Sequence, residues 1–297
     1  MLIDFQQHYT PPELLKGNAD AVSVQVDQDG NPNYLLNPLL ADLRWHIRVM
    51  DQAGIDAGVL SCGSGFDQPD IATCRLINDR MREAEKAHPG RFIGLAHVPA
   101  LKPAEAAAEL KRCAVELGFP GVVIASELQD QPLDAEALRP FWKSCADLGL
   151  YVFIHPLPRV IRWGRMDADD LGRMLGWEFS LMTATVRIIN SGLLDELPTL
   201  KIQFSHFSGY RPLSRPHPRL SAARQMGHRQ NSPPWPAAGS TFRLLSGSSV
   251  VLRYCRVGRA GSRGAMGRRL GAVRHRGTRL LATCIRDRLS AGGARCR

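Results

Sequence analysis

The sequence lacks the cysteine pattern of a disulfide framework or of a cysteine-bound zinc site. Its 297 residues include 7 cysteines, an odd number, and no Cys-x-x-Cys pair. No apolar run approaches the roughly 20 residues that a membrane-spanning helix needs. No secretory leader is expected, because Asp4 follows only three apolar residues. These absences predict a cytoplasmic protein with no membrane segment.

Lysine and acidic residues are nearly missing from the last part of the chain. Residues 209–297 contain 19 arginines, no lysine and one acid, Asp287, whereas residues 1–208 contain 19 basic and 27 acidic residues. The formal net charge of +10 therefore originates in the tail. A nucleic-acid arm usually mixes lysine with arginine and carries aromatic stacking groups, which are sparse here. We therefore expect no nucleic-acid partner and divide the chain after Ser208.

A glycine-rich phosphate turn is missing after the first predicted strand, Met1–Asp4, which leads into Gln6, Gln7 and His8. Strands and helices alternate from there to residue 208. Further strands are predicted at 55–61, 92–98, 121–125, 150–155 and 200–205, and helices at 40–54, 70–88, 102–117, 134–148 (broken at Pro140) and 171–194. Such alternation predicts a parallel sheet. The missing phosphate turn favours about six βα units of a (β/α)8 barrel over a doubly wound sheet.

Three histidines lie at or just beyond predicted strand ends: His8, His155 and His206. In a parallel barrel these ends all face one mouth. Neutral imidazoles that converge there are good ligands for Zn²⁺ or a similar divalent ion, so the sequence predicts a metal-type site. His97, near another strand end, fits a supporting or a purely structural role equally well. Two histidines are predicted on helix surfaces, His46 and His88.

The chain also resembles the amidohydrolase-2 branch of the amidohydrolase superfamily, which includes 2-amino-3-carboxymuconate 6-semialdehyde decarboxylase and γ-resorcylate decarboxylase. The resemblance covers residues 1–208 and rests on the order and spacing of five stretches: 48–54 (Arg-Val-Met-Asp-Gln-Ala-Gly), 91–95 (Arg-Phe-Ile-Gly-Leu), 116–122 (Glu-Leu-Gly-Phe-Pro-Gly-Val), 153–156 (Phe-Ile-His-Pro) and 197–207 (Leu-Pro-Thr-Leu-Lys-Ile through Ser-His-Phe). It implies a distorted (β/α)8 TIM-type barrel of the metal-dependent hydrolase superfamily, with one zinc or manganese ion.

The resemblance assigns roles to individual residues. It implies an Asp-x-His-x-His run on the first strand, a histidine ligand on the fifth, an aspartate ligand on the eighth and an acid/base histidine after the sixth. His8 and His155 match two ligands, and His206 matches the acid/base. Gln6 stands where the first histidine of the run is expected. Its amide offers only a neutral carbonyl oxygen, so we expect weaker metal binding or a water in the gap.

The family implies a nonoxidative carboxy-lyase, in which protonation of the carbon that bears the carboxylate releases CO₂. Its substrate would be a small aromatic or unsaturated carboxylic acid, and a homodimer is possible by the same resemblance. Arg48, one helical turn from Arg44, could hold the substrate carboxylate bidentately. The alternative for both arginines is a solvated helix face with ion pairs. The alternative activity is metal-dependent hydrolysis of a small lactone or amide.

Residues 209–297 do not continue the barrel. We find there neither two further apolar strands of the expected kind nor the aspartate that the eighth strand should carry. An arginine-rich, lysine-free segment is what a GC-rich gene yields when it is translated in a shifted frame. We therefore expect residues 1–208 to form a partial barrel domain and residues 209–297 an irregular, disordered tail. In that case the chain could be an inactive remnant of an enzyme.

Overall fold

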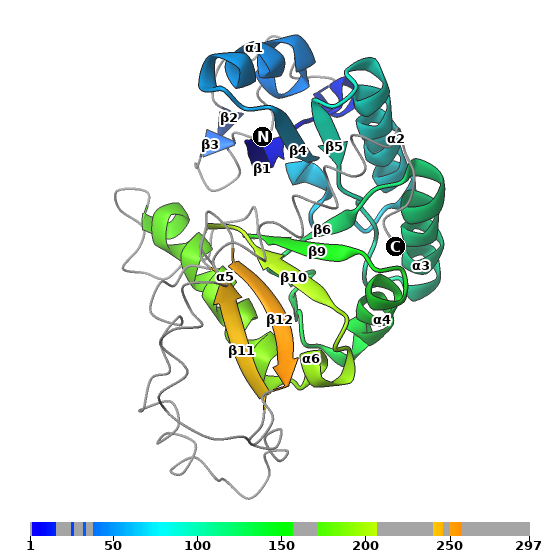
Figure 1. Ribbon diagram of the computed structural model, residues 1–297, viewed down its shortest axis with the longest axis vertical. Coiled ribbons are helices and arrows are strands. Elements are labelled where there is room, and N and C mark those ends of the chain that lie inside the picture. The colour runs from blue at the N-terminus through cyan, green and yellow to red at the C-terminus, as the bar shows by residue number, and fades with distance from the viewer. Residues whose placement is uncertain are drawn as a thin grey trace, which may run out of the picture.

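A computed structural model describes residues 2–15, 25–26, 32–33, 38–156, 171–206, 240–245 and 250–256. Six parallel strands form its centre: β1 (Ile3–His8), β4 (Ala57–Ser61), β5 (Phe92–Gly94), β6 (Gly121–Ala125), β9 (Tyr151–His155) and β10 (Lys201–Phe204). They neighbour one another in chain order, β1-β4-β5 and then β6-β9-β10, and a bridge from Ala96 to Val122 links the two groups (Figure 1).

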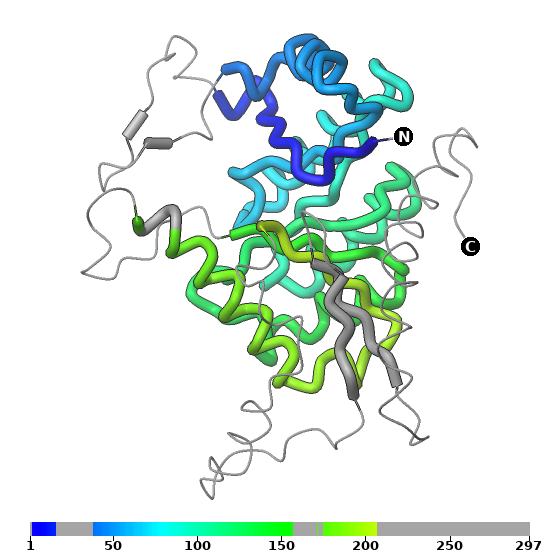
Figure 2. Tube along the Cα trace, turned by 60° about the vertical axis from the view of Figure 1, so that its left-hand side comes forward, coloured from blue at the N-terminus to red at the C-terminus, as the bar shows by residue number. Residues whose placement is uncertain are grey.

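This strand order distinguishes the two architectures that the alternation allows. A doubly wound sheet reverses its strand order at a switch point, whereas a barrel adds each new strand on the same side. No reversal occurs among the six parallel strands, and Figure 2 shows the trace passing steadily from blue β1 to green β9 and β10. The parallel α/β arrangement expected from the sequence is therefore confirmed.

Helices occupy the connections between these strands. They are α1 (Leu43–Ala53), α2 (Ile71–Ala87), α3 (Pro103–Arg112), α4 (Arg139–Asp147), α5 (Leu171–Asn190) and α6 (Leu193–Glu196). Asp42 caps α1 and Asp70 caps α2, because each carboxylate accepts a hydrogen bond from a backbone N–H of the first turn. No helix in the described ranges is long and apolar enough to cross a membrane.

The shorter elements lie in the connections. The two-residue strands pair as β2 (Gln25–Val26) with β3 (Pro32–Asn33) and β7 (Glu127–Leu128) with β8 (Gln131–Pro132). Single 3-10 turns occur at Pro12–Leu15, Pro38–Ala41, Gly63–Gly65 and Glu136–Leu138, and α3 continues into a π-helical turn at Cys113–Leu117. These elements close loops between the strands without altering the strand order.

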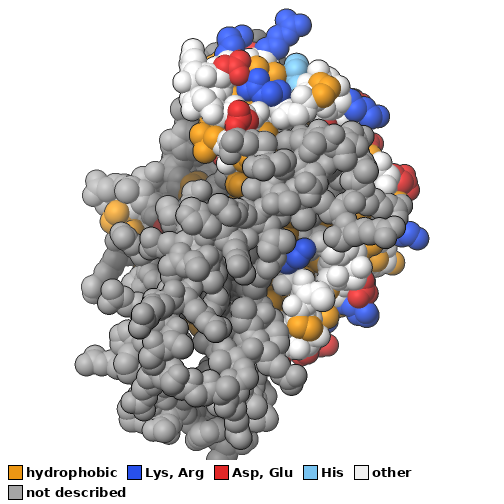
Figure 3. Space-filling model, in the orientation of Figure 1, with side chains coloured by type: hydrophobic (Ala, Val, Ile, Leu, Met, Phe, Trp, Pro, Cys, Tyr) orange, Lys and Arg blue, Asp and Glu red, His pale blue; other side chains and the backbone are white. Residues whose placement is uncertain are grey.

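The core lies on both sides of the strands, as expected for a parallel sheet covered by helices. Every residue of β4, β6 and β9 is buried. The visible described surface carries basic and acidic side chains interspersed, with no extended field of one sign (Figure 3). The described side chains visible in this view therefore carry both signs of charge, unlike the composition of residues 209–297.

Several element boundaries differ from the sequence prediction: β5 ends at Gly94 instead of residue 98, for example, and two other differences have a local cause. Strand β1 runs on to His8 instead of ending at Asp4, because it pairs with β4 as far as His8 and Ser61. Its register shifts between Asp4 and Gln7. Pro140 does not break a helix but lies in the first turn of α4. Backbone N–H groups of a first turn have no hydrogen-bond partner within the helix, so a proline there removes no helical bond.

The prediction of an irregular tail is wrong at two places. Strands β11 (Ser240–Leu245) and β12 (Val250–Arg256) form an antiparallel pair, and β12 also pairs antiparallel with β10 (Figure 1). The sequence offers a local reason, because residues 240–245 and 250–256 are two short runs rich in apolar and β-branched residues. The antiparallel direction of β12 differs from that of the next strand in a (β/α)8 barrel, which would be parallel to β10.

Candidate active site at the carboxyl ends of the parallel strands

Four polar side chains meet at the carboxyl ends of β1, β9 and β10. The Gln6 amide nitrogen lies 3.2 Å from His155 Nε2 and 3.0 Å from His206 Nε2. The ring centroids of His8 and His155 are 5.0 Å apart, and those of His155 and His206 are 5.7 Å apart. The four residues, which we call the mouth cluster, are the ones that the sequence assigned to metal binding and acid/base chemistry. Those roles stay predictions.

Strand geometry explains why Gln6 and His8 share a direction and Gln7 does not. Successive side chains of a strand point to opposite faces. Gln6 and His8 face the mouth, whereas Gln7 reaches outward, and its amide nitrogen donates to His46 Nδ1 of α1 at 3.0 Å. His155 is the last residue of β9, and Pro156 follows it with no N–H for a further ladder bond.

The ring of His155 is held in one tautomer. Its Nδ1 lies 2.9 Å from the carbonyl oxygen of Pro156, which can only accept, so Nδ1 carries the proton and Nε2 keeps its lone pair. Burial lowers the pKa of His155 well below its ordinary value, and the charge of His8 acts in the same direction. The ring of Phe66 packs against it with centroids 4.4 Å apart. His155 is therefore a neutral, fixed imidazole.

His206 is oriented by a carboxylate that the sequence did not single out. Its Nδ1 donates to Glu178 Oε1 of α5 at 3.0 Å, which turns Nε2 toward Gln6. The backbone of His206 has a φ of 47°, a left-handed conformation uncommon for a residue with a Cβ and found preferentially at functional sites. Nothing in the local pattern of α5 distinguishes Glu178 from a surface acid. Only the folded structure reveals its role.

His8 completes the set at the end of β1. Its Nδ1 lies 3.2 Å from the hydroxyl oxygen of Ser61, the last residue of β4, which leaves Nε2 available to another ligand. Burial lowers the pKa of His8 to about 4, and the charges of His206 and His46 contribute in the same direction. His8 is therefore neutral at physiological pH, the form in which imidazole binds metals.

The structure decides the positions of the other histidines. His46 is buried, contrary to the prediction of a surface position, because it lies one turn from Met50 on the inward side of α1. His97 is fully buried: Nδ1 donates to the Leu95 carbonyl oxygen at 3.0 Å, and Nε2 accepts from the backbone N–H of Cys62 at 3.0 Å. Both nitrogens of His97 are therefore engaged in structural bonds. His88 ends α2 and is partly exposed.

Arg48 does not join the mouth cluster. Its side chain is 63% exposed on α1, and its described ion pair is with Asp42 at 4.0 Å. This position corresponds to the solvated helix face that the sequence allowed as the alternative. A substrate-binding role for Arg48 stays a prediction that the described contacts do not support.

The donor chemistry of the mouth suits a divalent metal, although the present positions do not yet form a complete coordination shell. Among the residues that the structure describes, no three His, Cys, Asp or Glu side chains are arranged to hold an ion. The Nδ1 atoms of His8, His155 and His206 are each tied to a protein oxygen, which is the usual arrangement for histidines that bind metal through Nε2. In donor chemistry these residues therefore fit a Zn²⁺ or Mn²⁺ site, although the Gln6 amide nitrogen lies against two of the Nε2 atoms.

Together, the parallel strand order and the mouth histidines define the class as a barrel protein of the metal-dependent hydrolase type. The sequence profile of the Amidohydrolase family matches residues 3–235, so the chain belongs to this family. The match continues beyond Ser208, where the composition changes.

Two named relatives to which the chain is similar are decarboxylases. It is 34% identical to 2-amino-3-carboxymuconate-6-semialdehyde decarboxylase of Dictyostelium discoideum over 148 residues, 50% of this chain and 40% of the relative. It is 33% identical to γ-resorcylate decarboxylase of Polaromonas sp. JS666 over 230 residues, 71% of this chain and 68% of the relative. The chain therefore spans 40% of the length of the first relative and 68% of the length of the second.

A solved structure supports the same fold. Dihydroxybenzoic acid decarboxylase from Polaromonas sp. JS666, with bound manganese and the inhibitor 2-nitroresorcinol, superposes with a TM-score of 0.61 at 28% identity. The alignment covers 80% of this chain and 73% of that one. The bound metal and inhibitor belong to that relative.

Proposed function

We propose that the chain is a metal-dependent nonoxidative decarboxylase for a small aromatic carboxylic acid such as 2,6-dihydroxybenzoate. One observation carries the proposal: His8, His155 and His206 gather at the strand ends with their Nδ1 atoms tied to protein oxygens. The family match and the decarboxylase names of its relatives supply the reaction class. The solved relative with manganese supports a divalent metal as cofactor.

His8 and His155 would hold the ion through Nε2, with the Gln6 side chain beside it. When bound, the metal would supply a Lewis acid that binds and polarises substrate oxygens. The neutral state of His8 and His155 suits this role, because a protonated imidazole cannot bind a cation. Burial of both rings keeps them neutral well into the acidic range.

His206 is the residue placed to move a proton. Glu178 holds its Nδ1–H and stabilises the ring when Nε2 is also protonated, so the proton leaves from the Nε2 end. Transfer to the substrate carbon that bears the carboxylate forms a C–H bond. The bond from that carbon to the carboxylate then breaks, its electron pair returns to the ring, and CO₂ leaves. The leaving carboxylate supplies no proton, so His206 must regain one from solvent before the next turnover.

We also propose that residues 1–208 form the barrel part, with about six βα units, and that residues 209–297 are a separate segment translated in a shifted frame. The six parallel strands in chain order and the abrupt change in composition support this division, whereas the family match up to residue 235 and the pairing of β12 with β10 count against a separate segment that begins at residue 209. Sequencing the gene across Ser208 in independent clones tests it, since an uninterrupted frame in all of them contradicts the frameshift. A cytoplasmic location and a homodimer stay predictions from the sequence.

The activity is tested with the full chain, loaded with Mn²⁺ and incubated with 2,6-dihydroxybenzoate. We expect release of CO₂ and of the decarboxylated phenol, measured by chromatography, and one bound metal per chain by ICP-MS. His155→Ala should lose metal and turnover, whereas His206→Asn should keep metal and lose at least about 100-fold in rate. His88→Asn is the control, because His88 follows α2, is partly exposed and does not belong to the mouth cluster.

Two outcomes select the alternatives. Turnover of a small aromatic lactone without turnover of the acid would favour a hydrolase. Absence of both bound metal and turnover in the unmodified chain would favour an inactive remnant, an alternative that the neutral amide at position 6 keeps open.

A further inference from the structure

The Gln6 amide stands between the two imidazole nitrogens that face each other across the mouth. His155 carries its proton on Nδ1, where the Pro156 carbonyl accepts it, and His206 presents Nδ1–H to the Glu178 carboxylate. The Nε2 atoms of both rings are then acceptors in their neutral forms. Only the NH₂ end of the Gln6 side chain can donate to them, so the amide orientation follows from the network.

Gln6 thereby uses the lone pairs that a metal ion would use. Its two N–H groups donate to His155 Nε2 at 3.2 Å and to His206 Nε2 at 3.0 Å. An ion bound by an imidazole lies about 2.0–2.1 Å from the nitrogen and occupies its single lone pair. His155 therefore cannot donate its lone pair to an ion and accept from Gln6 at the same time.

We propose that Gln6 is an internal substitute for the metal ion, which closes the mouth cluster by hydrogen bonds and must be displaced before a divalent ion binds. The proposal concerns the same site as the proposed function and assumes that His155 is a ligand there. It explains how the buried His155 and the partly buried His206 have their Nε2 lone pairs satisfied by a protein donor. It also predicts that metal affinity and metal-free stability change in opposite directions at position 6.

A competing amide and a metal ligand can be told apart by how removal of the side chain changes metal affinity. If the Gln6 carbonyl oxygen bound the ion, removal of the side chain would weaken metal binding and leave the metal-free chain unaffected. If the amide competes with the ion, removal of the side chain leaves metal binding equal or tighter. The metal-free chain would then lose two hydrogen bonds and become less stable.

The experiment compares the full chain with Gln6→Ala and Gln6→Glu, and uses Gln7→Glu as a matched control. Gln7 lies next to Gln6 on β1, but its amide bonds to His46 and not to the mouth cluster. Mn²⁺ affinity is measured by the EPR signal of free Mn²⁺ during titration with MnCl₂. Metal-free stability is the melting temperature in EDTA. Neither readout requires turnover, so the proposal can stand or fall independently of the decarboxylase activity.

For Gln6→Ala we expect a melting temperature in EDTA lower by about 2–4 °C, from the loss of two hydrogen bonds, with Mn²⁺ affinity unchanged or tighter. For Gln6→Glu we expect Mn²⁺ affinity at least about tenfold tighter, because an anionic ligand replaces the competing donor. Its melting temperature in EDTA should fall and be restored by MnCl₂. Gln7→Glu should not tighten Mn²⁺ binding.

The proposal is overturned if Gln6→Ala weakens Mn²⁺ binding about tenfold at an unchanged melting temperature in EDTA. It is also overturned if neither variant at position 6 binds Mn²⁺. Gln6→Glu places a charge in a partly buried strand, so it could fail to fold. In that case the direction of the Gln6→Ala effect on affinity decides the question alone.

Discussion

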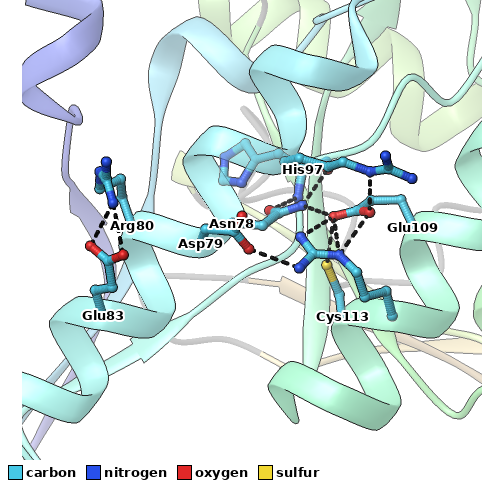
Figure 4. Close-up of polar contacts among 9 residues, drawn as sticks. Asn78, Asp79, Arg80, Glu83, His97, Glu109 and Cys113 are labelled. Carbon is cyan, nitrogen blue, oxygen red and sulfur yellow. Dashed lines mark hydrogen bonds and ion pairs between the residues drawn. The ribbon is translucent and has the colours of Figure 1, made fainter.

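Two polar clusters, one buried and one partly buried, lie among the parallel strands and their helices and differ in how their donors and acceptors are matched. One joins α2, α3 and the segment after β5, around Asn78, His97 and Glu109 (Figure 4). The other is the mouth cluster of Gln6, His8, His155 and His206. Both contain buried histidines at or near strand ends, and the sequence alone does not separate them.

The α2–α3 cluster is closed by donors and acceptors in matched positions. Asn78 Oδ1 accepts from the His97 N–H at 2.8 Å, and its amide nitrogen donates to the His97 carbonyl oxygen at 2.9 Å and to Glu109 Oε1 at 2.8 Å. Arg112 donates to Glu109 at 2.7 Å. Burial raises the pKa of Glu109, but the hydrogen bonds from Arg112 and Asn78 outweigh it and lower the pKa overall.

The mouth cluster, by contrast, has more hydrogen-bond acceptors than donors. His155 and His206 direct their Nε2 lone pairs at one point, and the Gln6 amide is the donor that meets both. A buried cluster with matched donors and acceptors stabilises the fold, whereas a cluster with surplus acceptors that converge is suited to bind a cation. The comparison therefore predicts that substitutions in the first cluster cost stability, and that substitutions of the histidines in the second cost metal binding or activity.

The largest effect on stability is expected for Glu109→Ala. The side chain of Glu109 is fully buried, and its removal takes away the acceptor that Arg112 and Asn78 share, so that Arg112 keeps only its pair with Asp79 and Asn78 only its bond to the His97 carbonyl oxygen. Breaking a buried charged network in this way costs about 3–5 kcal/mol in the free energy of unfolding. Urea denaturation monitored by circular dichroism measures it, with metal content recorded in parallel.

A matched control for Glu109→Ala lies on α2. Glu83 pairs with Arg80 at 2.7 Å, but its side chain is 61% exposed (Figure 4). Glu83→Ala should cost less than about 1 kcal/mol, as is usual for a surface ion pair. Equal losses in the two variants would remove the distinction between a buried and an exposed carboxylate on which the comparison rests.

Acid is expected to destabilise both clusters, with a smaller loss for each single histidine than for Glu109→Ala. Burial lowers the pKa of His97 to about 3, from an ordinary value near 6.5. The unfolded chain therefore binds a proton below pH 6.5 that the folded chain does not bind until about pH 3. Stability is complete above pH 6.5 and falls as the pH decreases. The loss between pH 7.5 and pH 4.5 should be about 2–3 kcal/mol for His97.

Urea denaturation at the two pH values measures that loss, and His8, whose pKa is lowered to about 4, should contribute a loss of similar size. NMR chemical shifts of the imidazole carbons identify the residues responsible. A folded chain in which the His97 ring titrates near pH 6.5 would show that this ring is not buried as the structure has it.

The helices and strands were predictable because their signals are local. Asp70 as a cap and Pro89-Gly90 as a stop delimit α2, which the structure places at Ile71–Ala87, and β6 has the predicted limits Gly121–Ala125. The β11–β12 pair was missed because the arginine-rich composition of the tail was given more weight than its short alternating runs. His46 was misplaced although its spacing to Met50 puts it on the buried side of α1.

The candidate site was predictable only in part, for a physical reason. Strand-end histidines can be recognised in a sequence because parallel strands direct their carboxyl ends to one mouth. The partners that fix their tautomers cannot, because Glu178 and Ser61 come from other elements and carry no local signature. The difference between His97 and His155 likewise depends on whether the second ring nitrogen meets a backbone donor, which only the fold determines.

The smallest effect on stability is expected for Glu178→Gln. The pair of Glu178 with His206 is about two-thirds buried, with side chains 33% and 26% exposed, and an amide oxygen can still accept from Nδ1–H. The free energy of unfolding should therefore change by less than about 1 kcal/mol. The negative charge that stabilises a doubly protonated His206 is lost, so turnover should fall about 10–100-fold. Urea denaturation and the decarboxylation rate, measured on the same preparation, test both parts. A stability loss as large as that of Glu109→Ala would place Glu178 with the structural carboxylates, because it would mean that the His206 contact holds the fold together.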